Sequence, residues 1–384
     1  MMEKIVYLDN NATTKPDPRV LEAMMPYLTE EYGNAASNHE FGVRINQAVN
    51  ESREKIANLI GSETNEIIFT SGATEAINIA IKGIAEYQKS NRKHIVTVQT
   101  EHPAVMDTCK YLEIIGYEIT YLPVQRSGLV DLDLVKKSVR DDTSLVCVMH
   151  VNNETGVIQP IKNISEIAHA KEALFMTDAT QSIGKIYTDI NDLGVDIMSF
   201  SAHKFYGPKG VGALYLRRRG LNKAKASTLI HGGGHERGMR SGTLNVPGIV
   251  GFGRAAEISK FEMSSNIEKI SKLRNYLEAE LLKVEGSFLN GDKANRLYNV
   301  CNICFRGADA DAIIIDLRNI MISNGSACSS TKIEPSHVLS AMGLNSADCY
   351  SSLRLSLGKF NTKSDIDYTI KKIKESVISL RLMN

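Results

Sequence analysis

Short apolar runs alternate with amphipathic helical patterns through most of the first two thirds of the chain. Such runs, when helices separate them, are typical of a mostly parallel sheet with helices on its faces. The pattern therefore predicts an α/β domain. The expected strands are residues 66–69, 94–98, 118–122, 144–149, 173–176, 196–200 and 213–216, and the expected helices between them include 75–87, 103–115 and 164–173.

Two further helices are expected before the first of these strands. Asp17 is suited to cap a helix that carries apolar residues as far as Leu28 and ends at Gly33. A second amphipathic pattern runs from about residue 42 to residue 60, and Gly61 is a typical stop for it.

The pattern changes after about residue 258. Residues 259–284 predict one long amphipathic helix, and a mixture of strands and helices follows it. This part of the chain predicts a smaller α+β domain. Its other expected elements are a strand at 298–305, a helix at 309–318, a strand at 353–357 and a final helix with a capping box from Thr362 to Asp365.

Polar residues follow five of the expected strands directly. In open α/β sheets, ligands bind outside the carboxyl ends of the strands. We therefore expect the five polar segments to face one site, which no single motif could indicate. The segments are residues 70–74, 100–102, 150–154, 178–181 and 201–204.

Lys204 and Asp178 suggest a specific chemistry for this site. Lys204 follows an apolar strand, where a pocket of low dielectric can keep its amine deprotonated, as a Schiff-base lysine requires. The alternative is a surface lysine in a glycine-rich turn. Asp178 ends another apolar run and favours the first interpretation, because pyridoxal phosphate (PLP) needs a Schiff-base lysine, an acid on its pyridinium nitrogen and phosphate donors.

Donors for a phosphate group are also present. Residues 71–74 offer hydroxyls and backbone amides before the helix at 75–87, although an ordinary helix cap is an alternative interpretation. Ser201 and His203 add further donors that are suited to an anion. The residues together indicate a PLP site.

Charge and apolar content narrow the class of protein. The 384 residues include 45 Lys and Arg against 44 Asp and Glu, so the net charge of +1 gives no electrostatic reason to expect a nucleic acid or a charged membrane as partner. The first residues hold too short an apolar run for a secretory signal, and no stretch approaches the ~18 apolar residues of a membrane span. We expect a cytoplasmic enzyme that acts on a small molecule.

Most of the six cysteines have a plain interpretation. Cys109 and Cys147 lie in apolar patterns and are expected to pack as small hydrophobic residues. Cys301 and Cys304 form a CxxC pair, but residues three apart on a strand point to opposite faces, which argues against a metal site. Cys349 has no assigned role.

Cys328 and Arg354 are two further candidate site residues, because each stands in an unusual sequence setting. The residues around Cys328 are small and mostly polar, which predicts a mobile segment and suits a nucleophile that must reach a cofactor and then carry a group away. Arg354 stands in an alternating apolar strand and is suited to bind a substrate carboxylate. A structural arginine in an ion pair is the alternative.

Four motifs in order give a specific resemblance. They are SFSAHKFYGPKG, TDATQSIGK, GGGHERGMRSGT and NGSACSSTKIEPSHVL, and the similarity runs from Tyr7 through the LRLSLGKF motif that begins at Leu353. The chain resembles the cysteine desulfurases of the NifS/IscS type in the class V family of PLP-dependent aminotransferases. This implies fold type I: a large domain over residues 15–258 with a mostly parallel seven-stranded sheet, and a small domain made of residues 1–14 and 259–384.

The resemblance also implies how the cofactor is held. Its phosphate would be bound by Ala73, Thr74, Ser201 and His203, and by Thr243 of the neighbouring subunit of a homodimer.

Other residues would act on the ring and the reacting atoms. By the same resemblance, Lys204 forms the Schiff base, Asp178 keeps the ring nitrogen protonated and Gln181 donates to the ring hydroxyl. His102 would stack on the ring and move protons on the substrate sulfur. Asn153 would contact both cofactor and substrate.

The implied reaction converts L-cysteine to L-alanine. Arg354 and Asn153 would bind the substrate carboxylate, and Cys328 would take the sulfur as a persulfide for an iron–sulfur scaffold or another acceptor. Cys328 is also a candidate transient ligand of an iron–sulfur cluster. The alternatives are a selenocysteine lyase or another aminotransferase-like enzyme, although a transaminase has no use for a mobile cysteine segment.

The chain departs from its relatives in two motifs. Gly33-Asn34-Ala35-Ala36 stands where relatives usually have Gly-Asn-Pro-Ser, and Asn324 replaces a common serine. The sequence also ends at Asn384, without the longer tail that helps many relatives to bind their scaffold. The choice of sulfur acceptor therefore stays open, among nitrogenase-type clusters, general cluster assembly and tRNA thiolation.

Overall fold

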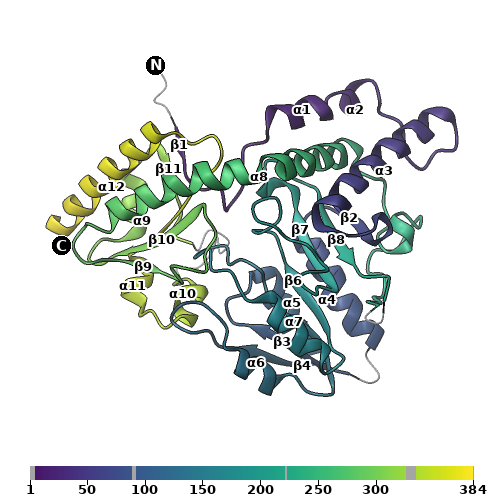
Figure 1. Cartoon of the computed structure of the whole chain (residues 1–384), viewed down its shortest axis with the longest axis horizontal. Coiled ribbons are helices and arrows are strands. Elements are labelled where there is room, and N and C mark those ends of the chain that lie inside the picture. The colour runs from purple at the N-terminus through teal and green to yellow at the C-terminus, as the bar shows by residue number, and fades with distance from the viewer. Residues whose placement is uncertain (1–4, 89–91, 221–222, 326–333, 384) are drawn as a thin grey trace.

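The computed structural model describes residues 5–88, 92–220, 223–325 and 334–383. Within these residues, seven strands form one sheet in the order β2-β8-β7-β6-β5-β3-β4 (Figure 1). The pairs from β7 through β4 are parallel, and β8 is antiparallel to both of its neighbours. The strands are β2 (Ile67–Thr70), β3 (His94–Val98), β4 (Glu118–Leu122), β5 (Thr143–Cys147), β6 (Leu174–Asp178), β7 (Ile197–Ser201) and β8 (Gly212–Leu216). The predicted mostly parallel, seven-stranded α/β sheet is confirmed.

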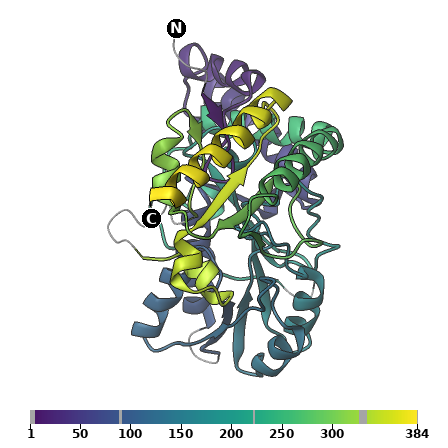
Figure 2. The same ribbon diagram turned by 90° about the vertical axis from the view of Figure 1, so that its left-hand side faces the viewer.

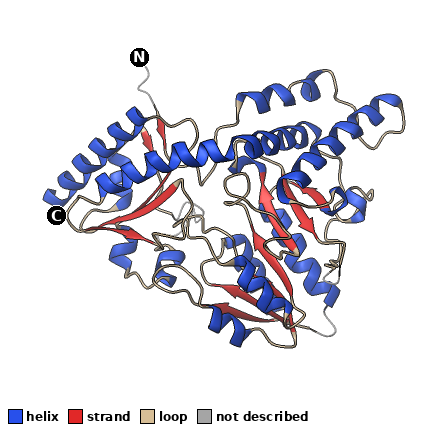
Figure 3. Ribbon diagram, viewed as in Figure 1, coloured by secondary structure: helices blue, strands red, loops and turns tan. Residues whose placement is uncertain are grey.

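Helices cover both faces of this sheet (Figure 3). Neighbouring strand residues belong to opposite apolar clusters: Phe175 packs in one and Met176 in the other. Because successive side chains on a strand alternate between faces, strands buried on both sides read as unbroken apolar runs. One cluster includes α4 (Ala73–Gln88) and α5 (Pro103–Ile114), and the other includes α3 (Glu40–Ile60), α6 (Leu132–Ser138) and α7 (Ile161–His169).

A smaller unit lies beside the large sheet and is built around an antiparallel sheet of order β12-β10-β9. The final helix α12 (Lys363–Met383) lies over it and is the yellow helix of Figure 2. Near the N-terminus β1 (Val6–Tyr7) pairs in parallel with β11 (Ile320–Met321), so the first described residues join this unit as expected. Its other elements are β9 (Ser287–Asn290), β10 (Val300–Phe305), α9 (Ala310–Asp316), α10 (His337–Ala341), α11 (Ser346–Tyr350) and β12 (Ser352–Ser356).

One helix, α8 (Val246–Leu281), runs through both units (Figure 1). Its apolar residues as far as Ile258 pack in the large core, whereas Ile270 and those after it pack in the small one. The helix begins earlier than the sequence pattern predicts, and the expected domain boundary at residue 258 falls inside it. The division into two domains stays a prediction.

Proline, glycine and capping residues explain where the other helices begin and end. Two helices, α1 (Pro18–Met24) and α2 (Pro26–Thr29), replace the single expected one, because Pro26 has no N–H to continue the first. Gly61 ends α3 in a left-handed conformation, as predicted. The capping box of α12 is confirmed by reciprocal bonds between Thr362 and Asp365 of 2.9 and 3.3 Å. The short elements α6 and β9 are among those that the pattern does not predict.

Among the described residues, no helix combines the length and the apolar character that crossing a membrane requires. The five described cysteines are buried and free. Cys301 lies in the apolar cluster of the small unit, and Cys304 approaches Asp348 instead. No group of three or more metal-ligating side chains is found in the described part of the chain.

The aromatic ring of Phe252 on α8 anchors the core beneath the polar edge of the sheet. It contacts the rings of Phe69, Phe200 and Phe205 at centroid distances of 6.5, 5.9 and 5.7 Å and is fully buried.

Phe252→Ala is expected to lower the free energy of unfolding by about 3–5 kcal/mol, measured by urea denaturation of the apoprotein. Phe261→Ala is the matched control on the same helix, where the side chain is 91% exposed, and should change it by less than about 0.5 kcal/mol. Equal losses in both variants would contradict this view of the core.

Candidate active site

A cavity of about 520 Å³ lies at the carboxyl ends of the strands of the large sheet, between this sheet and the small unit. All five polar segments predicted from the sequence have residues in or beside its wall. Ten of the predicted site residues line it: Ala73, Thr74, His102, Asn153, Asp178, Gln181, Ser201, His203, Lys204 and Arg354. A more open depression of about 730 Å³ between α3 and Arg237 contains none of them.

Lys204 lies in a short 3₁₀ turn that follows β7. Its ammonium donates to the backbone carbonyls of Asn11 and Ala12 at 2.7 and 2.8 Å. The turn is tight because Gly207 approaches Ala202 so closely that a Cβ atom there would lie 2.8 Å from its carbonyl oxygen. Lys204 is therefore placed at the cavity wall by the strand behind it and by the N-terminal segment in front of it.

Asp178 is the last residue of β6 and lies in the cavity wall, 6% exposed. One carboxylate oxygen accepts from the backbone amide of Thr180 at 2.9 Å. Three residues later, the side chain of Gln181 donates to the carbonyl of Asn11 at 2.8 Å. The carbonyl of Asn11 thus accepts from both Gln181 and Lys204.

His102 caps α5 and keeps one ring nitrogen for the cavity. Its Nδ1 accepts from the backbone amide of Ala104 at 3.1 Å, so a neutral ring carries its proton on Nε2. Burial lowers the pKa of His102, with the positive charge of Lys204 acting in the same direction and Asp178 opposing it. A neutral imidazole with its proton on Nε2 suits both stacking and proton transfer.

The predicted phosphate donors gather at the N-terminus of α4. The turn before this helix packs against β8, where a Cβ on Gly212 would lie 2.7 Å from the Cα of Gly72. Ser201 and His203 line the same part of the cavity. Burial lowers the pKa of His203 to about 4, with Lys204 and other lysines adding to the effect. The ring is therefore neutral at physiological pH and can donate one hydrogen bond to an anion.

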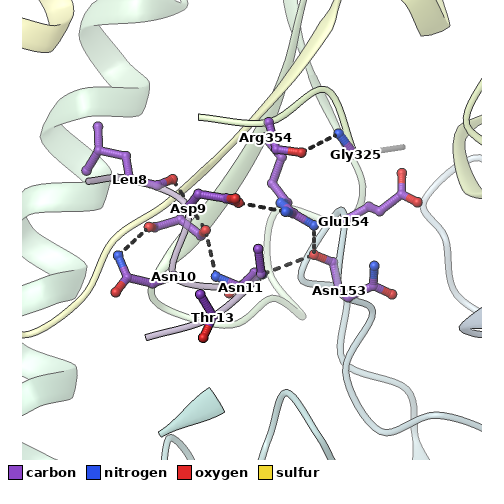
Figure 4. Close-up of polar contacts among 12 residues, drawn as sticks. Leu8, Asp9, Asn10, Asn11, Thr13, Asn153, Glu154, Gly325 and Arg354 are labelled. Atoms are coloured by element: carbon purple, nitrogen blue, oxygen red, sulfur yellow. Dashed lines mark hydrogen bonds and ion pairs between the residues drawn. The ribbon is translucent and has the colours of Figure 1, made fainter. Parts of the chain in front are cut away.

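Arg354 on β12 lines the cavity from the small unit. Its guanidinium donates to the carboxylate of Asp9 at 2.7 Å and to the carbonyl of Asn153 at 3.1 Å (Figure 4). The arginine is thus both a cavity residue and a member of an ion pair, and the two interpretations drawn from the sequence are compatible. Asp9 occupies one end of the guanidinium, and the side of the group that faces the cavity suits a carboxylate.

Two predicted residues are not part of this wall. Thr243 is exposed and does not line the cavity of its own chain. The loop before it is tied to α4 by an ion pair of 2.7 Å between Arg240 and Glu75. Cys328 belongs to residues 326–333, which lie outside the described residues, and Gly325 is the last described residue before them and lines the cavity.

The sequence pattern does not assign a role to several buried polar residues around the site. Glu154, next to Asn153, accepts from the hydroxyl of Ser336 at 2.5 Å, and burial raises its pKa. Glu101, which precedes His102 of the cavity wall, is fully buried, and burial raises its pKa well above the ordinary value. Lys185 bonds to Gln181 at 2.8 Å. Glu101 and Glu154 lie in polar segments that the sequence predicts, but the burial of their side chains depends on segments that are distant in sequence and could not be predicted.

The residues present fit PLP. The cavity volume lies within the range of about 300–1,000 Å³ that is usual for cofactor sites. It offers an amine, a buried carboxylate and donors at a helix N-terminus. Three buried polar atoms near it, Oδ1 of Asn153, Oγ1 of Thr180 and Nε of Arg354, have no hydrogen-bond partner within the described residues and so remain available to a ligand.

Comparison with known proteins gives the family. A model of the class V aminotransferases matches residues 6–369. The chain belongs to this family. Within class V it belongs with the cysteine desulfurases: it is 49% identical over 383 residues to the cysteine desulfurase IscS of Escherichia coli, covering 99% of this chain and 94% of that protein.

Solved structures of related proteins are similar throughout. A NifS-like protein superposes with a TM-score of 0.91 at 41% identity, covering 98% of this chain and 99% of the other. SspA, solved in complex with cysteine, has a TM-score of 0.81 at 36% identity and covers 93% and 100% of the two chains. The resemblance drawn from the four motifs is confirmed, together with the fold that it implies.

Proposed function

We propose that this chain is a PLP-dependent cysteine desulfurase that converts L-cysteine to L-alanine and holds the sulfur as a persulfide on Cys328. The observation that carries the proposal is the convergence of Lys204 and Asp178 on one cavity, in a chain that is 49% identical to a cysteine desulfurase over nearly its whole length. Selenocysteine lyase and other aminotransferase-like activities are not favoured.

The cofactor would be held at both ends. Ala73, Thr74, Ser201 and His203 would donate to its phosphate, where the N-terminus of α4 adds backbone amides and a favourable dipole. Asp178 would accept a hydrogen bond from the ring nitrogen and keep it protonated. When bound, PLP supplies an electron sink for the bond changes at the substrate Cα.

Four residues of this chain would act on protons and on substrate binding. Arg354 would bind the carboxylate of L-cysteine, and Asn153 would add its side-chain amide. The amine of Lys204, after its bonds to Asn11 and Ala12 are broken, would take the Cα proton. His102 would hold or move a proton at the substrate sulfur through Nε2.

Cys328 would receive the sulfur. Its thiolate would attack the substrate sulfur, so that a sulfur–sulfur bond forms as the carbon–sulfur bond breaks. The electron pair of the broken bond would stay with Cβ, which takes up the proton released by the thiol and becomes the methyl group of alanine. The persulfide on Cys328 would then pass to an acceptor, which we propose to be an iron–sulfur scaffold protein. A transient role of Cys328 as a cluster ligand, and a location in the cytoplasm, are further parts of the proposal.

The first prediction of this proposal concerns Lys204. Lys204→Ala should fold and still bind PLP weakly through its phosphate and Asp178, but it should lose the visible absorption band of the covalently held cofactor and all alanine formation, because the substitution removes the amine that forms the covalent linkage. Lys223→Ala, which removes an exposed lysine outside the cavity, should keep both. If Lys204→Ala kept full activity and a cofactor linkage that borohydride reduces, Lys204 would not be the Schiff-base lysine.

The second prediction separates Cys328 from cofactor binding. A free thiol has a pKa of about 8.5 and is mostly protonated at neutral pH, so the reaction needs a lowered value or a base. A hydroxyl is a far poorer nucleophile toward sulfur. Cys328→Ser should therefore keep the visible band and release essentially no alanine or sulfide from L-cysteine in the presence of a reductant.

Cys349→Ala, at a buried cysteine outside the cavity, is the control and should keep turnover. Mass spectrometry of the protein after reaction with L-cysteine locates the persulfide. Turnover in Cys328→Ser, or a persulfide mainly on Cys301 or Cys304, would move the nucleophile elsewhere.

The third prediction concerns a homodimer in which Thr243 completes the phosphate site of the partner subunit. The exposure of Thr243 and its absence from the wall of its own cavity support this arrangement. Mixed dimers separate the two geometries. A Lys204→Ala chain paired with a Thr243→Val chain should retain one intact site with the visible band, because the chain that keeps Lys204 receives the threonine of the other chain.

The reference dimer pairs a wild-type chain with a chain that carries both substitutions. In this dimer the one site that keeps Lys204 faces the substituted position 243 of the other chain. Cofactor retention should therefore be lower than in the first mixed dimer, although both dimers carry the same two substitutions. Equal retention in the two mixed dimers, or a fully loaded monomer at micromolar concentration, would refute the arrangement.

A further inference from the structure

Lys185 is a buried lysine that takes no part in the proposed reaction. It follows Gln181 by four residues in the turns after β6, and its residue surface is only 4% exposed. Its ammonium donates to Oε1 of Gln181 at 2.8 Å, which is a neutral acceptor and not a carboxylate. An enclosed charge with a neutral partner is an unusual use of a lysine.

The surroundings of Lys185 disfavour its charge. Burial lowers its pKa to about 7, and the positive charges of Lys204 and Arg354 act in the same direction. Replacing a buried charge by an apolar side chain of similar size is often neutral or stabilising, so folding alone gives no reason for a lysine here. Its contact with a cavity residue points to the site.

The bond to Lys185 settles how the amide of Gln181 is oriented. Amide oxygen and nitrogen atoms can be told apart only by their partners, and a lysine ammonium has donors alone. When Lys185 is protonated, the atom of Gln181 that faces it must therefore be oxygen. The nitrogen then faces Asn11, whose carbonyl accepts one of its two hydrogens at 2.8 Å. The second hydrogen is left for the cavity that Gln181 lines.

We propose that Lys185 is a positioning residue that holds the Gln181 amide with its nitrogen toward the cavity, so that the second N–H can bind the ring oxygen of the cofactor. This inference rests on the proposed binding of PLP. In the flipped orientation the amide oxygen would face the carbonyl of Asn11 and present an acceptor to an anionic ring oxygen. The ammonium of Lys185 also polarises the amide, which strengthens its N–H as a donor.

The experiment compares the holoenzyme with three single variants and one double variant. Lys185→Met removes the donor and keeps the length of the side chain, whereas Lys185→Gln keeps a neutral donor. The readout is the rate at which PLP leaves during dialysis, followed by the visible band. We expect about fivefold faster loss from Lys185→Met, as for one hydrogen bond of about 1 kcal/mol, and an intermediate rate from Lys185→Gln.

The Gln181→Leu variant tests whether Lys185 acts through the Gln181 amide, because it removes that amide. If Lys185 acts through this amide, adding Lys185→Met to Gln181→Leu should leave the rate of PLP loss unchanged. The apoprotein of Lys185→Met should melt at the wild-type temperature or above it, because a desolvated charge is gone. A merely structural lysine would instead lower the melting temperature and leave PLP retention unaltered.

Two outcomes would overturn the inference. One is that wild type and Lys185→Met lose PLP at equal rates. If Lys185→Met does not fold, Lys185→Gln is compared with wild type instead, and equal rates of PLP loss would again overturn the inference. The other is an additive effect of Lys185→Met in the Gln181→Leu background, which would show that it acts by another route. A wild-type protein that takes up no PLP would refute the proposed function itself, before any variant is compared.

Discussion

The site depends on one buried asparagine that bonds to both units of the chain. The backbone carbonyl of Asn11 accepts from Lys204 and Gln181 of the large unit. Toward the small unit, the backbone N–H of Asn11 donates to the hydroxyl of Ser356, and the side-chain oxygen of Asn11 accepts from Asn299. The N-terminal segment thus joins the strand that carries Arg354 to the turn that carries the lysine, and it fixes where the two halves of the cavity meet.

Among the described residues, the cavity wall carries three cationic side chains, Lys204, Lys209 and Arg354, against two acidic ones, Asp178 and Glu75. Lys204 and Arg354 lie close enough to lower the pKa of Lys185, while Asp178 and Asp9 supply the nearby negative charge. A wall with more cationic than acidic side chains favours ligands with phosphate and carboxylate groups. Both groups occur on the proposed cofactor and substrate.

Much of this could be predicted from the sequence, for identifiable reasons. The strands are predicted correctly because residues such as Phe175 and Met176 are both buried, on opposite faces of the sheet. The polar residues that follow five of the strands mark the edge where ligands bind. The break at Pro26 is a local effect that the apolar pattern alone does not show. Asn11 gains its role from Lys204 and Gln181, which are distant in sequence. Lys185 bonds to Gln181 only four residues away, and what the sequence does not show is its burial.

The continuity of α8 has a mechanical consequence. A helix of 36 residues is about 54 Å long. Because its two ends are packed into different cores, the small unit cannot swing like a flap on a hinge loop at this connection. Movement at this connection would need the helix to bend or to lose its packing in one of the two cores, so α8 limits how far Arg354 can move away from the large sheet.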